Sequence, residues 1–322
     1  MKNGLIENFG KVTQAALASN RLNLSLLIVL FFAVILYQQM TTAYRLVILL
    51  IPVALLMLKF ILALVLRKIV ISNPVLLIFH MALFALVSLA IVGQFTYLKA
   101  TLELSTQEEF NGRLENIDAG PWHNYQLDKV KFTNLGFSIN YHKGIMRDST
   151  RNRIQLGKQI VEIGDHVPLV IGHYRFYTTH NKGYAPLFRW IPADGSAVQL
   201  GNIHLPAYPI HEYQQAKEWT LPQTQQKIWT MLVIEEDLLP EDRDFNFRVS
   251  YKHHLIIRIA GQRYVLRQGD EIKLPEGILR YDSLVSWMGY TVDYDWTRPW
   301  LFAASLIALL SLFFYYFARL KN

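Results

Sequence analysis

The sequence predicts an α+β membrane protein with four transmembrane helices, three before and one after a large, mostly-β extracytoplasmic domain. The first observation is composition: the 322 residues are 52% hydrophobic and 18% charged, whereas soluble domains carry roughly 25% charged residues. The second is that the apolar residues gather into four runs near the length of a bilayer crossing, roughly 20 residues. The third is that residues 99–296 alternate between apolar and polar positions, with turn residues between the alternating stretches. An ordinary soluble enzyme is therefore excluded.

The four apolar runs divide the chain into segments. They are Leu22–Tyr37, Leu46–Leu66, Val75–Leu98 and Pro299–Leu320. We expect an amphipathic cytoplasmic segment at 1–21, three transmembrane helices at 22–98, the β-rich domain at 99–296, and the fourth helix with a short cytoplasmic tail at 297–322. Within the first segment, the apolar spacing over residues 5–17 favours a short helix on the inner membrane surface.

The positive charges predict the orientation. Residues 1–98 and 319–322 hold nine Lys and Arg against one acid, Glu7. Most of these bases lie before the first run, between the second and third, and after the fourth. Because Lys and Arg in short loops stay in the cytoplasm, both termini are expected there and the large domain outside. The rest of the chain holds 23 bases and 24 acids, which excludes the basic face of a nucleic-acid-binding domain.

The external block reads as strands with turns between them. Alternation covers Lys129–Tyr141, Tyr174–Thr179, Leu255–Ile259 and Arg263–Leu266, and the turn signals include His142–Gly144, Asn181–Gly183, Ala193–Gly195, Ala260–Gln262 and Pro275–Gly277. The spacing favours an antiparallel sandwich or a pair of sheets. Residues 211–245 are polar, with an acidic run, and we expect a loop or short helices there.

Catalytic motifs are missing from the sequence. Nine of the ten histidines lie in the external block, but none has HExxH spacing, and there is no GxSxG motif or phosphate loop. His253 and His254 are adjacent, so on a strand they would point to opposite faces. The chain has no cysteine, which excludes a disulfide framework, a zinc–thiolate site and a CxxC redox role.

Two ionisable residues interrupt the apolar runs, and such residues are candidates for function. His80 lies six residues after Pro74, about 9 Å along the third helix, and Lys59 lies eight residues before Arg67, about 12 Å from the end of the second, at 1.5 Å per residue. Because the connection between these runs is short, both residues should lie at similar depth in the cytoplasmic half of the bilayer. Haem suits this pair, since its iron accepts an axial histidine and its propionates are anions that a lysine could neutralise. The alternatives are an interhelical hydrogen bond for His80 and snorkelling to the interface for Lys59.

Several stretches resemble the ResB (CcsB) family of cytochrome c biogenesis. Those that carry the resemblance are Leu17–Leu22, Phe79–Leu86 running to Gly93, Leu102–Ser105 with Glu108 and Glu109, Phe132–Tyr141, Pro168–Leu169 with Gly172–Tyr177, and Trp287–Val292. The order of three spans, an external domain and a last span is also similar to that family. The resemblance extends over nearly the whole chain.

The resemblance implies a membrane subunit of the system II cytochrome c synthetase in the bacterial cytoplasmic (inner) membrane. Its partners would be a CcsA (ResC)-like membrane subunit, the apocytochrome c that receives haem, and membrane lipid, with thiol-reducing proteins as further candidates. Haem b would be held transiently, with His80 as axial ligand of its iron; the role of Lys59 toward a propionate is our inference from the residues. Only one histidine lies in any span, so a bis-histidine haem needs its second ligand from another chain. This subunit would then be an accessory to the haem lyase, with no catalytic residue of its own.

Two other functions remain open from the sequence. The first is a haem-free, membrane-anchored scaffold that docks extracytoplasmic partner proteins through its β-rich domain. The second is an electron-transfer subunit that oxidises quinol, which usually needs paired histidines across spans, whereas this chain has one.

Overall fold

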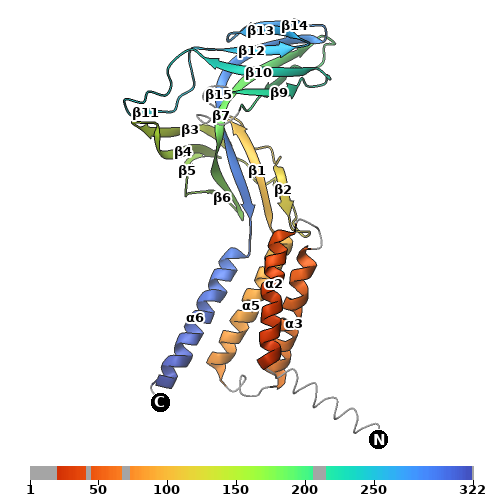
Figure 1. The fold of residues 1–322 in the computed structure, drawn as a ribbon, viewed down its shortest axis with the longest axis vertical. Helices are drawn as coiled ribbons and strands as arrows, with labels where there is room; N and C mark the ends of the chain where they lie inside the picture. The colour runs from red at the N-terminus through yellow and green to blue at the C-terminus, as the bar shows by residue number, and fades with distance from the viewer. Residues whose placement is uncertain (1–19, 41–44, 67–72, 206–214, 321–322) are drawn as a thin grey trace. The chain divides into compact units, whose positions relative to one another are not determined.

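The computed structural model describes residues 20–40, 45–66, 73–205 and 215–320 as an α+β protein with a large, mostly-β part (Figure 1). The chain forms two units. The helical unit consists of Met1–Tyr97, Gly120–His123 and Asp295–Asn322, and the β unit of Leu98–Ala119 and Asn124–Tyr294. The four-residue stretch Gly120–His123 thus belongs with the helices although residues of the β unit flank it in sequence. The amphipathic helix expected over residues 5–17 lies outside the described residues.

The helical unit contains four described helices at the four apolar runs. They are α2 (Asn20–Gln39), α3 (Arg45–Leu66), α5 (Pro74–Thr96) and α6 (Arg298–Leu320). Of the helices in the described residues, α5 and α6 are long and apolar enough to cross a membrane; the apolar stretches of the other two, Leu24–Gln39 and Val47–Ile61, are shorter. By length and composition, then, two of the described helices could cross a membrane.

Helix α5 packs mainly against α6. Gly93 lies in this contact, where a Cβ would come within 3.0 Å of the hydroxyl of Thr297. On α6 the buried residues are small, Ala304, Ala308 and Ser311, and residues three and four apart share a helix face. Small side chains allow two helices to approach closely without a hydrophobic driving force in lipid.

The β unit consists of three antiparallel sheets. The seven-stranded sheet contains β1 (Leu98–Ser105), β2 (Glu115–Ala119), β6 (Leu169–Ile171), β7 (Tyr174–Pro192), β8 (Gln199–Asn202), β14 (Glu271–Leu274) and β15 (Gly277–Tyr294). A four-stranded sheet contains β9 (Ala216–Thr220), β10 (Lys227–Ile234), β12 (His253–Ile259) and β13 (Gln262–Leu266). The other contains β3 (Thr133–His142), β4 (Met146–Leu156), β5 (Gln159–Gly164) and β11 (Phe245–Asn246).

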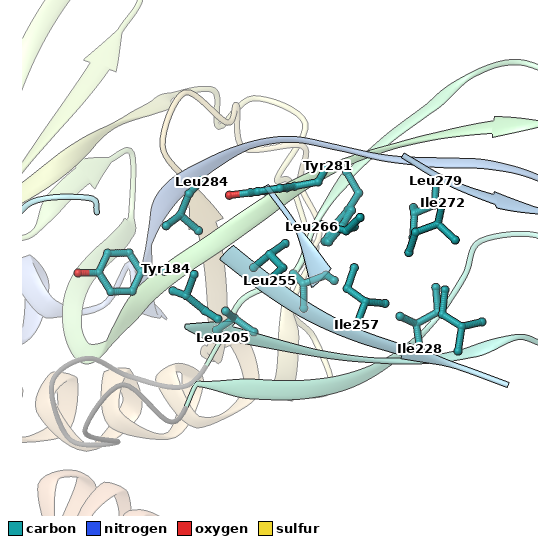
Figure 2. Packing of buried hydrophobic residues seen from close by; sticks show 14 of the residues in the cluster. Tyr184, Leu205, Ile228, Leu255, Ile257, Leu266, Ile272, Leu279, Tyr281 and Leu284 are labelled. Carbon is teal, nitrogen blue, oxygen red and sulfur yellow. The ribbon is translucent and has the colours of Figure 1, made fainter. Parts of the chain in front are cut away.

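Two long strands serve two separate hydrophobic cores. Strands β7 and β15 pair along their lengths, from Gly277 opposite Pro192 to Tyr294 opposite Tyr174. Their Phe188 and Tyr281 belong to the first core, which also includes residues of the β9–β10–β12–β13 sheet. Figure 2 shows Leu255 and Ile257 of that sheet with Leu279, Tyr281 and Leu284 of β15.

The second core lies at the other ends of the same two strands. Phe176 of β7 and Tyr290 of β15 pack there with Leu102 of β1 and with Ile154 and Ile163 of the sheet that contains β4 and β5. With 19 residues in β7 and 18 in β15, each strand is about 60 Å long at roughly 3.3 Å per residue, enough to line two cores in succession.

Two of the local predictions are wrong. The turn expected at Asn181–Gly183 does not form, because β7 continues through it and stays paired with β15 across a bulge near Met288 and Tyr290. Residues 211–245 do not form only loops or helices, since β9 and β10 lie there. Polar residues such as Glu218 occupy strand positions that face solvent, whereas the acidic run Glu235–Asp237 with Glu241 and Asp242 lies between β10 and β11.

Other local predictions are confirmed. The stretches expected as strands lie largely within β3, β7, β12 and β13. The turn at Ala260–Gly261 joins β12 to β13, with φ of 49° and 80° at the two central residues. Positive φ at both positions is the geometry of a two-residue hairpin turn, for which glycine is favoured.

Candidate functional site

Local sequence places His80 in the second turn of α5. The helix begins at Pro74, which is compatible with a first helical position because its missing N–H would have no helical partner. The side chain of Asn73 caps this end by accepting a hydrogen bond from the backbone N–H of Leu76 at 3.1 Å. His80 is half-buried.

One ring nitrogen of His80 is fixed by its own helix. Nδ1 lies 2.7 Å from the carbonyl oxygen of Leu76. A carbonyl can only accept, so Nδ1 carries the proton and Nε2 carries the lone pair. Among the described residues, none forms a hydrogen bond with Nε2.

Helix α3 meets His80 through an aromatic contact. The ring of Phe60 stacks on His80 at a centroid distance of 5.7 Å and an interplanar angle of 12°, and on Phe84 at 6.0 Å. Lys59 directly precedes Phe60 and is 5% exposed. Phe60 of α3 therefore contacts His80 of α5, and Lys59 is buried on the same turn of α3.

This arrangement fits an axial ligand of haem iron. A metal-bound histidine usually donates its other N–H to a carbonyl or carboxylate, which fixes the tautomer and orients the ring. His80 has that arrangement through Leu76. Among the described residues, no three His, Asp or Glu side chains gather as a metal site.

A cluster of His204, Glu103 and Ser105 lies in the β unit, and the sequence analysis did not predict it. His204 Nδ1 donates to Glu103 Oε2 at 2.8 Å, and His204 Nε2 lies 3.0 Å from Ser105 Oγ. The ring of His204 also stacks on Trp287 at 4.8 Å and 15°. The hydrogen bond from His204 holds the pKa of Glu103 below its ordinary value, against the opposite effect of burial.

These three residues have the hydrogen-bond order of a Ser–His–Glu triad, but the surroundings do not suit acyl transfer. Ser105 is 3% exposed. Its backbone N–H donates to Glu108 Oε2 at 2.8 Å, and the N–H groups of Thr106 and Gln107 donate to Ser286 and Asn134. A triad enzyme needs free donors beside the serine for the developing oxyanion. The cluster therefore fixes β1 against the segment after β8.

A pocket of about 370 Å³ lies beside this cluster. Its floor includes Phe188, Trp190 and Trp219, and its polar lining includes Glu103 and Lys217. Pockets of roughly 300–1,000 Å³ with an apolar floor and a few polar groups are typical of binding sites.

Gly201 of β8 lines the pocket, and neither its backbone conformation nor the packing around it requires a glycine. Its φ lies outside the left-handed region, and no described atom lies within 4 Å of the place where a Cβ would stand. A strand glycine with open space above it often marks the close approach of a ligand or of another backbone.

The expectation for the adjacent histidines of the β unit is confirmed. His253 and His254 point to opposite faces of β12: His253 Nε2 lies 2.6 Å from Tyr281 Oη, and His254 Nδ1 lies 2.7 Å from Glu235 Oε1. The signal for the missed cluster was the shared strand face of Glu103 and Ser105, which are two residues apart. His204 lies 99 residues from Ser105 in sequence, so the sequence could not pair them.

No known family model matches the chain, and no curated protein sequence matches it either.

Proposed function

We propose that this protein is a ResB-like subunit of a cytochrome c haem lyase, which holds haem b during its export for covalent attachment to apocytochrome c. The supporting observation is the fixed tautomer of His80, with the Nδ1 proton held by Leu76 and the Nε2 lone pair available on an apolar helix. Haem is the cargo, and its iron would accept that lone pair. The CcsA (ResC)-like partner would supply the second axial ligand, because no other histidine lies in the described helices.

The proposal includes four membrane crossings and a bacterial inner-membrane location with both termini in the cytoplasm. Helices α2 and α3 contain 20 and 22 residues, and about 20 residues of helix cross a hydrocarbon core of roughly 30 Å. The hydrogen bond from Tyr37 Oη to Gln94 Oε1, 2.7 Å long, joins α2 to α5 near one end of each. In the sequence, most Lys and Arg outside the β unit stand before or at the start of α2, between α3 and α5, or at the end of α6, which supports the orientation.

In this proposal, Lys59 neutralises a haem propionate from α3. Its position next to Phe60, whose ring stacks on His80, supports this role. Replacement of Lys59 by Gln should weaken the retention of haem during purification, and replacement by Arg should weaken it less. Equal retention by the wild type and both variants would remove Lys59 from the site.

The test of the central claim is the haem spectrum of the purified complex. The chain is co-expressed with a CcsA-like partner, and the Soret absorbance per protein is measured for the wild type, His80→Gly and His166→Ala. We expect His80→Gly to lose the band, imidazole in the buffer to restore it, and His166→Ala, which changes an exposed histidine of the β unit, to match the wild type. Unchanged haem content and ligand field in His80→Gly would overturn the ligand role.

The pocket in the β unit favours a second candidate function, a haem-free scaffold that docks extracytoplasmic partner proteins. The open space at Gly201 and the apolar floor support it. The probe is a fluorescently labelled, haem-free apocytochrome c chain, titrated against the wild type, Gly201→Leu and the control Gln159→Leu on β5. Binding that only Gly201→Leu weakens, by about tenfold or 1.4 kcal/mol, would support docking; equal binding by all three would exclude this pocket.

A further inference from the structure

The stretch Gly120–His123 is fastened to the end of α5 that leads into β1. The backbone N–H of Trp122 donates to Phe95 O at 2.8 Å, and that of Gly120 donates to Tyr97 O at 2.9 Å. The side chain of His123 adds a third bond, from Nδ1 to Thr96 O at 2.8 Å. Three consecutive carbonyls at the end of the helix are thus satisfied by one short stretch from elsewhere in the sequence.

These bonds satisfy backbone groups that every helix leaves open at its C-terminal end. The last carbonyls of any helix lack partners within the helix, and a carbonyl that is removed from water needs another donor. The approach is so close that a Cβ at position 120 would lie 2.3 Å from Phe95 O. Only glycine can occupy that position.

The same stretch holds an indole at the surface. Trp122 stacks on Phe95 at 4.2 Å and 24°, yet it remains 64% exposed. Trp296 donates from Nε1 to Thr96 Oγ1 at 2.9 Å, and Trp300 in the first turn of α6 is 59% exposed. Three indoles therefore belong to this one end of α5 and α6.

We propose that Gly120–His123 is an interfacial anchor whose Trp122 side chain inserts among the lipid headgroups and glycerol groups of the leaflet at this end of α5. Tryptophan favours that depth because its ring is apolar and its N–H needs a polar partner. A rigid stretch bonded to the end of α5 fixes the depth of the whole helix. His80, 16 residues before Thr96, then lies about 24 Å deeper at 1.5 Å per residue. The inference rests on the membrane crossing of α5 and α6 and does not depend on haem.

The chain has no cysteine, so single cysteines can report on its depth. The full-length variants Pro121→Cys, Tyr251→Cys and Leu309→Cys are labelled with bimane and reconstituted in phosphatidylcholine–phosphatidylglycerol vesicles. Tyr251 is 85% exposed in the β unit, and Leu309 is 65% exposed on α6. Fluorescence is quenched from the lipid by doxyl groups near the glycerol or deep in the acyl chains, and from the water by iodide.

We expect the label at position 121 to be quenched by the shallow doxyl lipid and to be several-fold less sensitive to iodide than the label at position 251. The label at position 309 should respond to the deep doxyl lipid. If lipid quenches the label at position 309, while iodide and not lipid quenches the label at position 121, the anchor is overturned and the membrane crossing of α6 stands. A label at 309 that responds only to iodide would overturn the membrane crossing of α6 and with it both proposals.

A second variant tests the indole itself. In Pro121→Cys the further change Trp122→Ala should raise iodide quenching and lower shallow-lipid quenching, whereas Trp122→Phe should have a smaller effect and Trp229→Phe, in the β unit, none. The near-ultraviolet circular dichroism of each variant reports whether the fold is kept. Unchanged quenching in a folded Trp122→Ala variant would show that the indole does not hold the stretch in the interface.

Discussion

His80 in the helical unit and His204 in the β unit start from the same arrangement and differ in one hydrogen bond. In both rings Nδ1 donates to an oxygen, that of Leu76 for His80 and that of Glu103 for His204. The Nε2 atom of His204 is occupied by Ser105, whereas no described residue bonds to that of His80. A histidine with both nitrogens satisfied stabilises a fold, while one with a fixed proton and an available lone pair can bind a ligand. Single substitutions can therefore separate the two roles.

The largest effect on stability is expected from His204→Ala. It removes the charge-assisted bond to Glu103, the bond to Ser105 and the stack on Trp287, and leaves a partly buried carboxylate without this donor. We expect the free energy of unfolding to fall by about 3 kcal/mol. Chemical denaturation in detergent, followed by tryptophan fluorescence, measures it. A loss below about 0.5 kcal/mol would mean that the cluster does not hold β1.

A smaller and pH-dependent effect is expected from Glu103→Gln, which keeps an acceptor for His204 but removes the charge. We expect a loss of about 1 kcal/mol at neutral pH. Because the pKa of Glu103 is lowered in the folded protein, its stabilising contribution is complete above the ordinary value of 4.5 and disappears as the pH falls and the folded carboxylate becomes protonated.

Melting curves of the wild type and Glu103→Gln between about pH 7 and pH 3 test this sign. The difference between the two proteins should shrink toward acid. Glu162→Gln, on an exposed ion pair with Arg151, is the matched control and should differ little from the wild type at any pH. A difference that grows toward acid would contradict the assigned direction.

Ser105→Ala should cost less than either change, about 0.5–1 kcal/mol, the range for one neutral hydrogen bond. The variant leaves the bond between Glu103 and His204 in place. Its unfolding free energy should therefore lie between those of the wild type and His204→Ala. A cost as large as that of His204→Ala would show that the hydroxyl, and not the carboxylate, orients the ring.

The smallest effect is expected from His80→Leu. Since Nδ1 bonds only within its own helix and Nε2 has no described partner, thermal unfolding in detergent without haem should change by less than about 0.5 kcal/mol. A loss near 2 kcal/mol would mean that Nε2 has a structural partner, and the contrast with His204 would disappear.

The sequence predicted the helices well because their signals are local. The long apolar run predicted α5 to within two residues at each end, and the hairpin at Ala260–Gly261 follows from its turn residues. The continuation of β7 through Asn181–Gly183 could not be predicted, because it depends on pairing with β15 about 100 residues later.

The candidate sites divide in the same way. His80 stands out in the sequence because a titratable residue in an apolar run is unusual. His204 looks like any other histidine of the external block until the fold brings it to Glu103 and Ser105. The stretch Gly120–His123 is equally hidden, since its partners at Phe95 and Thr96 are reached only after the excursion through β1 and β2.

The shared strands β7 and β15 have a consequence for how the β unit comes apart. Both hydrophobic cores of the β unit contain residues of the same two strands, so neither half could be expressed alone without exposing unpaired strand edges and apolar side chains. Calorimetry should accordingly record one cooperative melting event for the whole unit, and any cross-link or insertion that disturbs one interior should lower the melting point of the other.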